Sequence, residues 1–344
     1  MTAADLTLAG EYHSARAAAA ATQAWSEAEV QVSGTRQTMG DLFKALTGGV
    51  ARFVLAWMVP SVVTLGLFTI FLLPEVRTLW PFSVIDGIAS DLLMSGILFG
   101  FFVLVFSLIF AYASLPIYRL LEGYSLPAGV RRRLEIRHLR KWKVLKAREL
   151  AAERRNQDPP GLVKEKLNAY PQSSESIRAT ALGNALTAME GFGRTRYGLD
   201  SQSVWYELQA VVPETVRKQT EEGRAPVDFF VSSIAHFALL CPAFLAVAAA
   251  KGSPGLGFIG LLVGAAIPVS YRMAVRNVKD WGGSVRALVN LGRRPLAESL
   301  GLEMPKRLVD ERHMWASFLW AIEQLDPDVV EYYDSYRFTP RPPE

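Results

Sequence analysis

The sequence predicts an all-α, polytopic membrane protein with four transmembrane helices and a helical cytoplasmic domain. Half of its 344 residues are hydrophobic although 20% are charged, and the two kinds of residue are segregated into separate blocks. Four apolar blocks are long enough to cross a membrane, since a helix needs roughly 20 residues to cross ~30 Å of hydrocarbon. No segment sustains the alternation of apolar and polar residues that predicts a β-strand.

The four expected spans are residues 53–73, 92–115, 229–250 and 256–275. Pro60 lies inside the first span, and we expect it to kink that helix because proline cannot donate a backbone hydrogen bond. The link between the last two spans, Lys251–Gly255, is very short. The third and fourth spans are therefore expected to form an antiparallel hairpin.

The distribution of Lys and Arg predicts the orientation in the membrane. These residues are abundant between spans two and three and after span four, whereas the segment 74–91 carries only Arg77 and the other hairpin link only Lys251. Positively charged loops stay on the cytoplasmic side, so both termini are expected to be cytoplasmic. The first fifty residues lack the pattern of a cleaved signal peptide.

These features divide the chain into five parts. They are an N-terminal cytoplasmic segment (1–50), a first transmembrane hairpin (51–115), a basic helical cytoplasmic domain (116–227), a second transmembrane hairpin (228–276) and a C-terminal cytoplasmic helical segment (277–344). Further helices are expected over 278–302 and 310–325, where apolar residues recur at helical spacing.

The segment 131–155 contains eleven Lys and Arg against three Glu. Its spacing predicts a long basic helix that continues from span two. We expect this helix to lie near the membrane and bind anionic lipid headgroups, because each basic residue near such a surface contributes about 1 kcal/mol. The residues assigned to headgroup binding are Arg131, Arg132, Arg133, Arg137, Arg140 and Lys141. A dedicated phosphoinositide-type or nucleic-acid site is the alternative, supported by charge alone.

A second helical unit follows, with an amphipathic helix predicted over 177–189. Its densest polar cluster is formed by Glu190, Arg194, Arg196 and Asp200. Asp200 is also expected to cap the next helix, which carries Trp205. We assign Glu190, Arg196, Asp200 and Trp205 to partner binding, and the alternative is a surface ion-pair network.

Part of the chain resembles a known group of proteins. Leu182-Gly-Asn184, Glu190, Arg196-Tyr-Gly-Leu-Asp200 and Trp205 look like a motif of uncharacterised multi-span membrane proteins from actinobacteria, and the resemblance extends over residues 176–320. It implies a bacterial inner-membrane protein with this motif in the cytoplasm. It implies no particular activity.

Few residues inside the spans are polar. His236 in the third span is a candidate pore or packing residue, since a titratable group in hydrocarbon should face water or a partner. Gly260 and Gly264 in the fourth span form a GxxxG pattern, which lets two helices approach closely. This pattern predicts either packing against the third span or the contact surface of a homo-oligomer.

No enzymatic chemistry is visible in the sequence. Phosphate-binding loops, zinc helices and nucleophile elbows are missing, Cys241 is the only cysteine, and the four histidines lie in separate elements. We therefore expect no catalytic residues, no metal and no cofactor. A formal net charge of only +4 also makes nucleic acid an unexpected partner.

These observations favour an integral membrane anchor or a signalling or scaffold component that binds a protein partner through its cytoplasmic helices. The alternative is a channel or transporter with a pathway beside spans three and four. That alternative rests on the proline- and glycine-containing spans and on two similar segments, Leu115-Pro-Ile-Tyr-Arg119 and Ile267-Pro-Val-Ser-Tyr-Arg272, which could reflect a repeat of two hairpins.

Overall fold

The structure, a computed structural model, describes residues 50–79, 92–323 and 335–337. The chain divides into two compact units, Met1–Val54 and Leu55–Glu344, and the description below concerns the second. The expected segment 1–50 lies almost entirely outside the described residues, as does most of the loop between the first two spans. The described residues are helical and contain no strand, only an isolated bridge between Leu302 and Arg337. The all-α prediction is confirmed.

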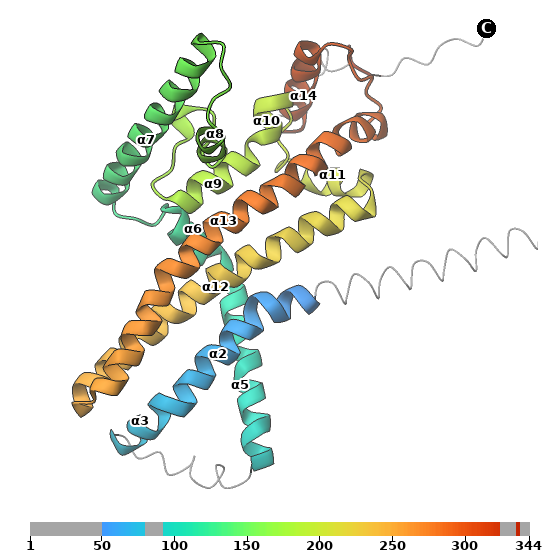
Figure 1. The fold of residues 1–344 in the computed structure, drawn as a ribbon. Coiled ribbons are helices and arrows are strands. Elements are labelled where there is room, and N and C mark those ends of the chain that lie inside the picture. The colour runs from blue at the N-terminus through green and yellow to red at the C-terminus, as the bar shows by residue number, and fades with distance from the viewer. Residues whose placement is uncertain (1–49, 80–91, 324–334, 338–344) are drawn as a thin grey trace, which may run out of the picture. The chain divides into compact units, whose positions relative to one another are not determined.

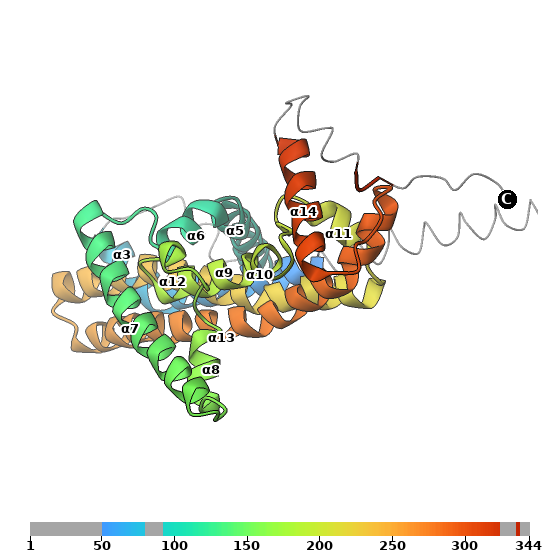
Figure 2. The same ribbon diagram turned by 90° about the horizontal axis from the view of Figure 1, so that it is seen from above.

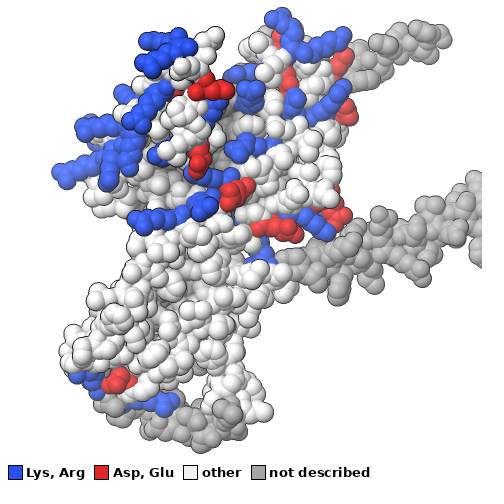
Figure 3. Space-filling view, in the orientation of Figure 1, with Lys and Arg blue, Asp and Glu red and all other residues white. Residues whose placement is uncertain are grey.

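Four helices are long and apolar enough to cross a membrane, as the sequence predicts. They are Val50–Arg77, Leu93–Tyr112, Glu214–Lys251 and Pro254–Ser299. In Figure 3, charged side chains crowd the upper part of the visible face and a smaller group lies at its lower end, while the zone between them is uncharged. This protein is therefore a four-span membrane protein.

The first span changes its helical winding around its proline. A π-helical stretch, Val54–Met58, precedes α2 (Val59–Leu67), and a second one, Phe68–Leu72, leads into α3 (Leu73–Leu79). Pro60 lies in the first turn of α2, where the missing backbone donor is tolerated best. Only the first π-helical stretch adjoins Pro60, whereas the second ends two residues before Pro74.

The basic helix does not continue from the second span, contrary to the sequence prediction. The span helix α5 (Leu92–Tyr112) is followed by a short helix, α6 (Ser114–Glu122), and the basic helix α7 (Ala128–Arg154) begins after a loop. Gly123 ends α6 in the left-handed conformation, with φ +95°, a typical helix stop. Pro127 then precedes α7, so the chain turns between the two helices.

The third and fourth spans are parts of two much longer helices. α12 covers Glu214–Lys251 and α13 covers Pro254–Ser299, and Gly252 in the left-handed conformation joins them. The two helices pack against each other as a hairpin (Figure 1). The expected domain boundaries at 227–228 and 276–277 therefore fall inside continuous helices.

We call the charged halves of α12 and α13, together with α6 to α11 and α14, the extramembrane domain. The helices of this domain that have not yet been described lie around those two halves. They are α8 (Gly161–Leu167), a 3-10 turn (Ser174–Ser176), α9 (Ala181–Glu190), α10 (Phe192–Tyr197), α11 (Trp205–Val211) and α14 (Leu308–Glu323). In both views, α11 and α14 lie near the C-terminal end of α13 (Figures 1 and 2). Glu165 of α8 is paired with Lys279 in the middle of α13.

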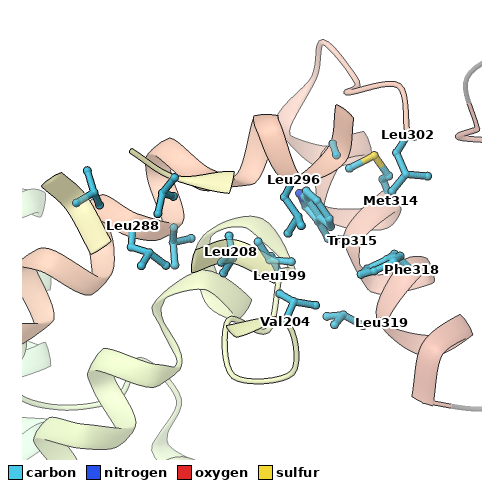
Figure 4. Packing of buried hydrophobic residues seen from close by; sticks show 14 residues of the cluster. Leu199, Val204, Leu208, Leu288, Leu296, Leu302, Met314, Trp315, Phe318 and Leu319 are labelled. Carbon is cyan, nitrogen blue, oxygen red and sulfur yellow. The ribbon is translucent and has the colours of Figure 1, made fainter. Parts of the chain in front are cut away.

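Two apolar cores hold the extramembrane domain together, and α13 contributes to both. The first core joins α9, α12 and α13 through residues such as Leu186, Val231 and Val285. The second joins α11, α13 and α14 (Figure 4) and contains the fully buried Trp315 and Met314. Burial of side chains this large stabilises each core by several kcal/mol, about 3–5 kcal/mol for an aromatic side chain replaced by alanine.

Candidate functional site

The four residues that the sequence assigns to partner binding are separated into three environments. Glu190 and Asp200 line a common cavity. Arg196 is exposed on α10 and lines no described cavity, while Trp205 is half-buried and packs against both apolar cores. Only the first two therefore share one site.

The sequence motif around these residues has a clear packing role. Gly183 lies so close to α6 that an added Cβ would be 2.6 Å from the carbonyl oxygen of Glu122, and a Cβ on Gly198 would be 2.5 Å from that of Arg312. The side chain of Asn184, the residue after Gly183, is buried. Its Oδ1 accepts a hydrogen bond from the amide of Arg178, and its Nδ2 donates one to the carbonyl oxygen of Arg178. Much of the motif thus serves to dock α9 on α6 and α10 on α14.

Asp200 does not cap α11, contrary to the prediction. Its Oδ1 accepts a hydrogen bond from the amide of Gln202, 3.0 Å away, and its Oδ2 lies 3.6 Å from Nη1 of Arg194. Turn residues separate it from the helix, whose N-cap is Val204. Asp200 therefore stabilises a turn, as short acidic side chains often do.

We name the cavity beside Glu190 and Asp200 the upper cavity. Its volume is about 550 Å³. Charged residues of both signs line it: Lys146, Glu149, Arg178, Glu190, Arg194, Asp200 and Arg286. Arg178 lies over the ring of Tyr124, with 5.0 Å from Cζ to the ring centroid, and its Nε donates to Oγ1 of Thr187 at 3.4 Å. No pattern in the sequence marks Arg178 as a residue of this cavity.

The electrostatic environment of the upper cavity favours the neutral form of one carboxyl group. The pKa of Glu190 is raised to about 7, mainly by desolvation of its carboxyl group and also by the nearby carboxylates of Glu122 and Asp200, while Arg178 opposes this shift. Burial also raises the pKa of Glu122, against the opposing effect of Arg178 and Arg119. Glu190 consequently changes charge near neutral pH.

A second cavity lies along α13 just beyond its apolar half, and we name it the juxtamembrane cavity. Its volume is about 710 Å³, and its cationic lining residues are Arg272, Arg276, Lys279 and Arg286. Glu165 and Asp280 also line it, and Lys279 is paired with Glu165 at 3.4 Å. Asn168 and Arg286 border both cavities, so the two adjoin.

The sequence contained a signal for this second cavity. Arg272, Arg276, Lys279 and Arg286 are spaced by four, three and seven residues, which places them along one side of a helix. On their own, Lys and Arg residues after span four indicate only the orientation of the chain in the membrane. The walls contributed by α8 and α9 could not be foreseen, because they depend on how distant segments pack.

The six basic residues of α7 that the sequence assigns to headgroup binding lie outside both cavities. Arg131, Arg132, Arg133, Arg137, Arg140 and Lys141 are exposed and line neither cavity. Arg131 is within 3.8 Å of Glu135 on the same helix. His138 forms a hydrogen bond with the hydroxyl of Tyr170 at 3.0 Å, which ties α7 to the segment after α8. Headgroup binding by α7 remains a prediction.

Within the spans, the predicted pore or packing residues are enclosed by protein. His236 is fully buried, its Nε2 lies 3.0 Å from Oγ of Ser61, and its Nδ1 lies 2.8 Å from the carbonyl oxygen of Ser232. Gly260 and Gly264 face α12: a Cβ at the first would be 3.0 Å from Cβ of Phe244, and one at the second 3.1 Å from Sγ of Cys241. The two glycines thus lie within the hairpin.

Among the described residues, no group of three His, Cys, Asp or Glu side chains is arranged to hold a metal ion. The charged and polar side chains that line both cavities offer ionic and hydrogen-bonding contacts to a ligand. Comparison of the chain with protein-family models, with curated proteins and with solved structures gives no match.

Proposed function

We propose that this protein is an anchor or scaffold of a bacterial cytoplasmic membrane, with both termini inside, and that its extramembrane domain binds a protein partner. The observation that carries this proposal is the continuity of α13. Its first eighteen residues are uncharged, and its charged half contributes Val285 to one extramembrane core and Leu288 and Leu296 to the other. The domain is thereby mounted directly on a transmembrane hairpin.

The packing of the spans favours an anchor over a channel. The polar side chains of His236 and Ser61 are hydrogen-bonded to each other, and the ring of Phe110 lies against the imidazole. Polar groups buried in this way strengthen contacts between helices. A conduction pathway would instead require such groups to face water.

The surface of α10 and α11 is the proposed contact for the partner. Arg196 is exposed there, and the side chain of Tyr206 is 83% exposed. Tyr and Arg are the residue types that most often anchor protein interfaces, and nothing in the packing of α11 requires an aromatic residue at position 206. This assignment keeps Arg196 as a binding residue and gives Trp205 a supporting role.

Photocrosslinking in living cells tests this proposal. A photoreactive amino acid replaces Tyr206 or Arg196, and matched controls carry it at Leu261 or Leu262, which are exposed on the apolar half of α13. We expect a discrete crosslinked protein from the first two positions and none from the controls. The same protein should cease to co-purify when Tyr206→Ala and Arg196→Glu are combined. Unchanged co-purification, or identical crosslinks from all four positions, contradicts the proposal.

A further inference from the structure

We propose that the juxtamembrane cavity binds a phosphate-ester anion and that the source favoured by its position is the headgroup of an anionic phospholipid. Four cationic side chains line it, against two carboxylates. Guanidinium and ammonium groups donate charge-assisted hydrogen bonds to phosphate oxygens. The excess of cations is the first observation that indicates an anionic ligand.

The second observation is that most of these cations lack a counter-charge. Within the described part of the chain, Arg272, Arg276 and Arg286 form no ion pair, and only Lys279 is paired. Other arginines of the same domain do have carboxylate partners. Arg293 is paired with Glu311, and Arg224 lies 3.4 Å from Asp228.

Like charges gathered on one side of a helix repel one another. A bound anion removes that repulsion, and the carboxylates that could do so within the protein are too few. Glu165 is paired with Lys279, and among the described residues Asp280 forms no ion pair with any of the four cations. The cavity therefore carries an excess of positive charge that a bound anion would neutralise.

The position of the cavity along α13 favours a lipid. Arg272 is the first charged residue after the apolar half of the helix, which places it at the depth of the phosphates of a bilayer. Leu262, Val269 and Met273 are exposed by 55%, 56% and 36%. These three residues are spaced by seven and four positions, and Arg276 follows three positions later, so all four lie along one side of the helix.

This exposed apolar side provides a surface for acyl chains directly below the cations. The cavity itself has apolar walls as well, formed by Ala185, Met189, Val275 and Val278. A headgroup among the arginines and chains along Val269 and Leu262 would match both parts of the surface. A soluble phosphate ester would use the same cations without the apolar side.

The test uses the purified full-length protein in a neutral detergent. The site variant combines Arg272→Gln, Arg276→Gln and Arg286→Gln. The control variant also removes three charges, by Arg217→Gln, Lys306→Gln and Arg307→Gln, all exposed outside the cavity. Native mass spectrometry measures binding of phosphatidylglycerol and phosphatidylcholine, and calorimetry measures binding of glycerol 3-phosphate.

We expect the unmodified protein and the control variant to prefer phosphatidylglycerol over phosphatidylcholine, and the site variant to bind phosphatidylglycerol about tenfold more weakly or worse. Arg272→Lys with Arg276→Lys keeps the charge and should keep binding. Glycerol 3-phosphate binding that only the site variant loses would also support the anion site and identify a soluble ligand. Equal losses in site and control variants, or no preference for any anionic probe, overturn the proposal. Thermal unfolding of each variant verifies that it is folded.

Discussion

The imidazole ring of His236 stacks on the phenyl ring of Phe110, with the ring centroids 3.8 Å apart and the planes inclined by 25°. Phe106 contacts the same imidazole edge-on at 5.4 Å. Ser61 on α2 and Ser232 on α12 complete the surroundings through hydrogen bonds. Three spans therefore meet at one histidine, and its polar atoms are satisfied within the protein.

This arrangement predicts that Ser61→Ala destabilises the assembly of the spans. The substitution removes the partner of His236 Nε2 and should lower the free energy of unfolding in mild detergent by about 1 kcal/mol. Ser107→Ala is the matched control, because buried Ser107 donates only to the carbonyl of Val103 on its own helix. Equal effects of the two substitutions would show that the contact between Ser61 and His236 contributes nothing.

A second prediction concerns the docking of α14. Gly198 has φ +79°, and an added Cβ would be 2.5 Å from the carbonyl oxygen of Arg312. Gly198→Ala therefore combines left-handed backbone strain of about 1–2 kcal/mol with a steric clash. Gly301 has φ +72° but nothing within 4 Å of an added Cβ, so Gly301→Ala reports the strain alone. Gly198→Ala should lower the melting temperature clearly more than Gly301→Ala does.

A third prediction follows from the carboxyl group of Glu190. Its pKa is raised from the ordinary 4.5 to about 7, so the folded protein holds a proton on it at pH values where the unfolded chain does not. Its contribution to stability is fully present below pH 4.5 and is lost as the pH rises through about 7. Glu190→Gln imitates the protonated group and should raise the melting temperature at pH 8 but not at pH 4.5.

Glu175→Gln is the control for this pH dependence, because Glu175 lies in the 3-10 turn and lines neither cavity. It should leave the pH profile unchanged. If the difference in melting temperature between Glu190→Gln and the unmodified protein stays the same from pH 4.5 to 8, the raised pKa of Glu190 is not the cause of the pH dependence.

The helices were predictable because their signals are local. Length and hydropathy predict the four spans, and the apolar spacing over 310–325 predicts α14, observed at Leu308–Glu323. The continuity of α13 was partly visible, since helical spacing resumes within a few residues of the span. The prediction of one continuous helix is wrong at the break between α5 and α7, which Gly123 and Pro127 mark, because the basic periodicity over 131–155 predicts a helix without specifying where it begins.

The sites were harder to predict because they depend on packing between distant segments. Asp200 was expected to cap a helix, but the turn after it shifts the start of α11 to Trp205. The two similar segments near Arg119 and Arg272 also differ in structure, since the first follows a helix break at Ala113 and the second lies inside α13. No periodicity specifies such differences.

The most direct test of the anchor proposal is solute and ion flux across liposomes that contain the purified protein, measured for the unmodified chain and for Phe110→Ala. Removal of the ring that covers His236 would open a pathway along the spans if the protein were a channel. We predict no flux from either protein, at any voltage and for every solute of a broad panel. If either protein conducts a flux, and the His236→Ala substitution changes that flux, the account is contradicted and the protein is a channel.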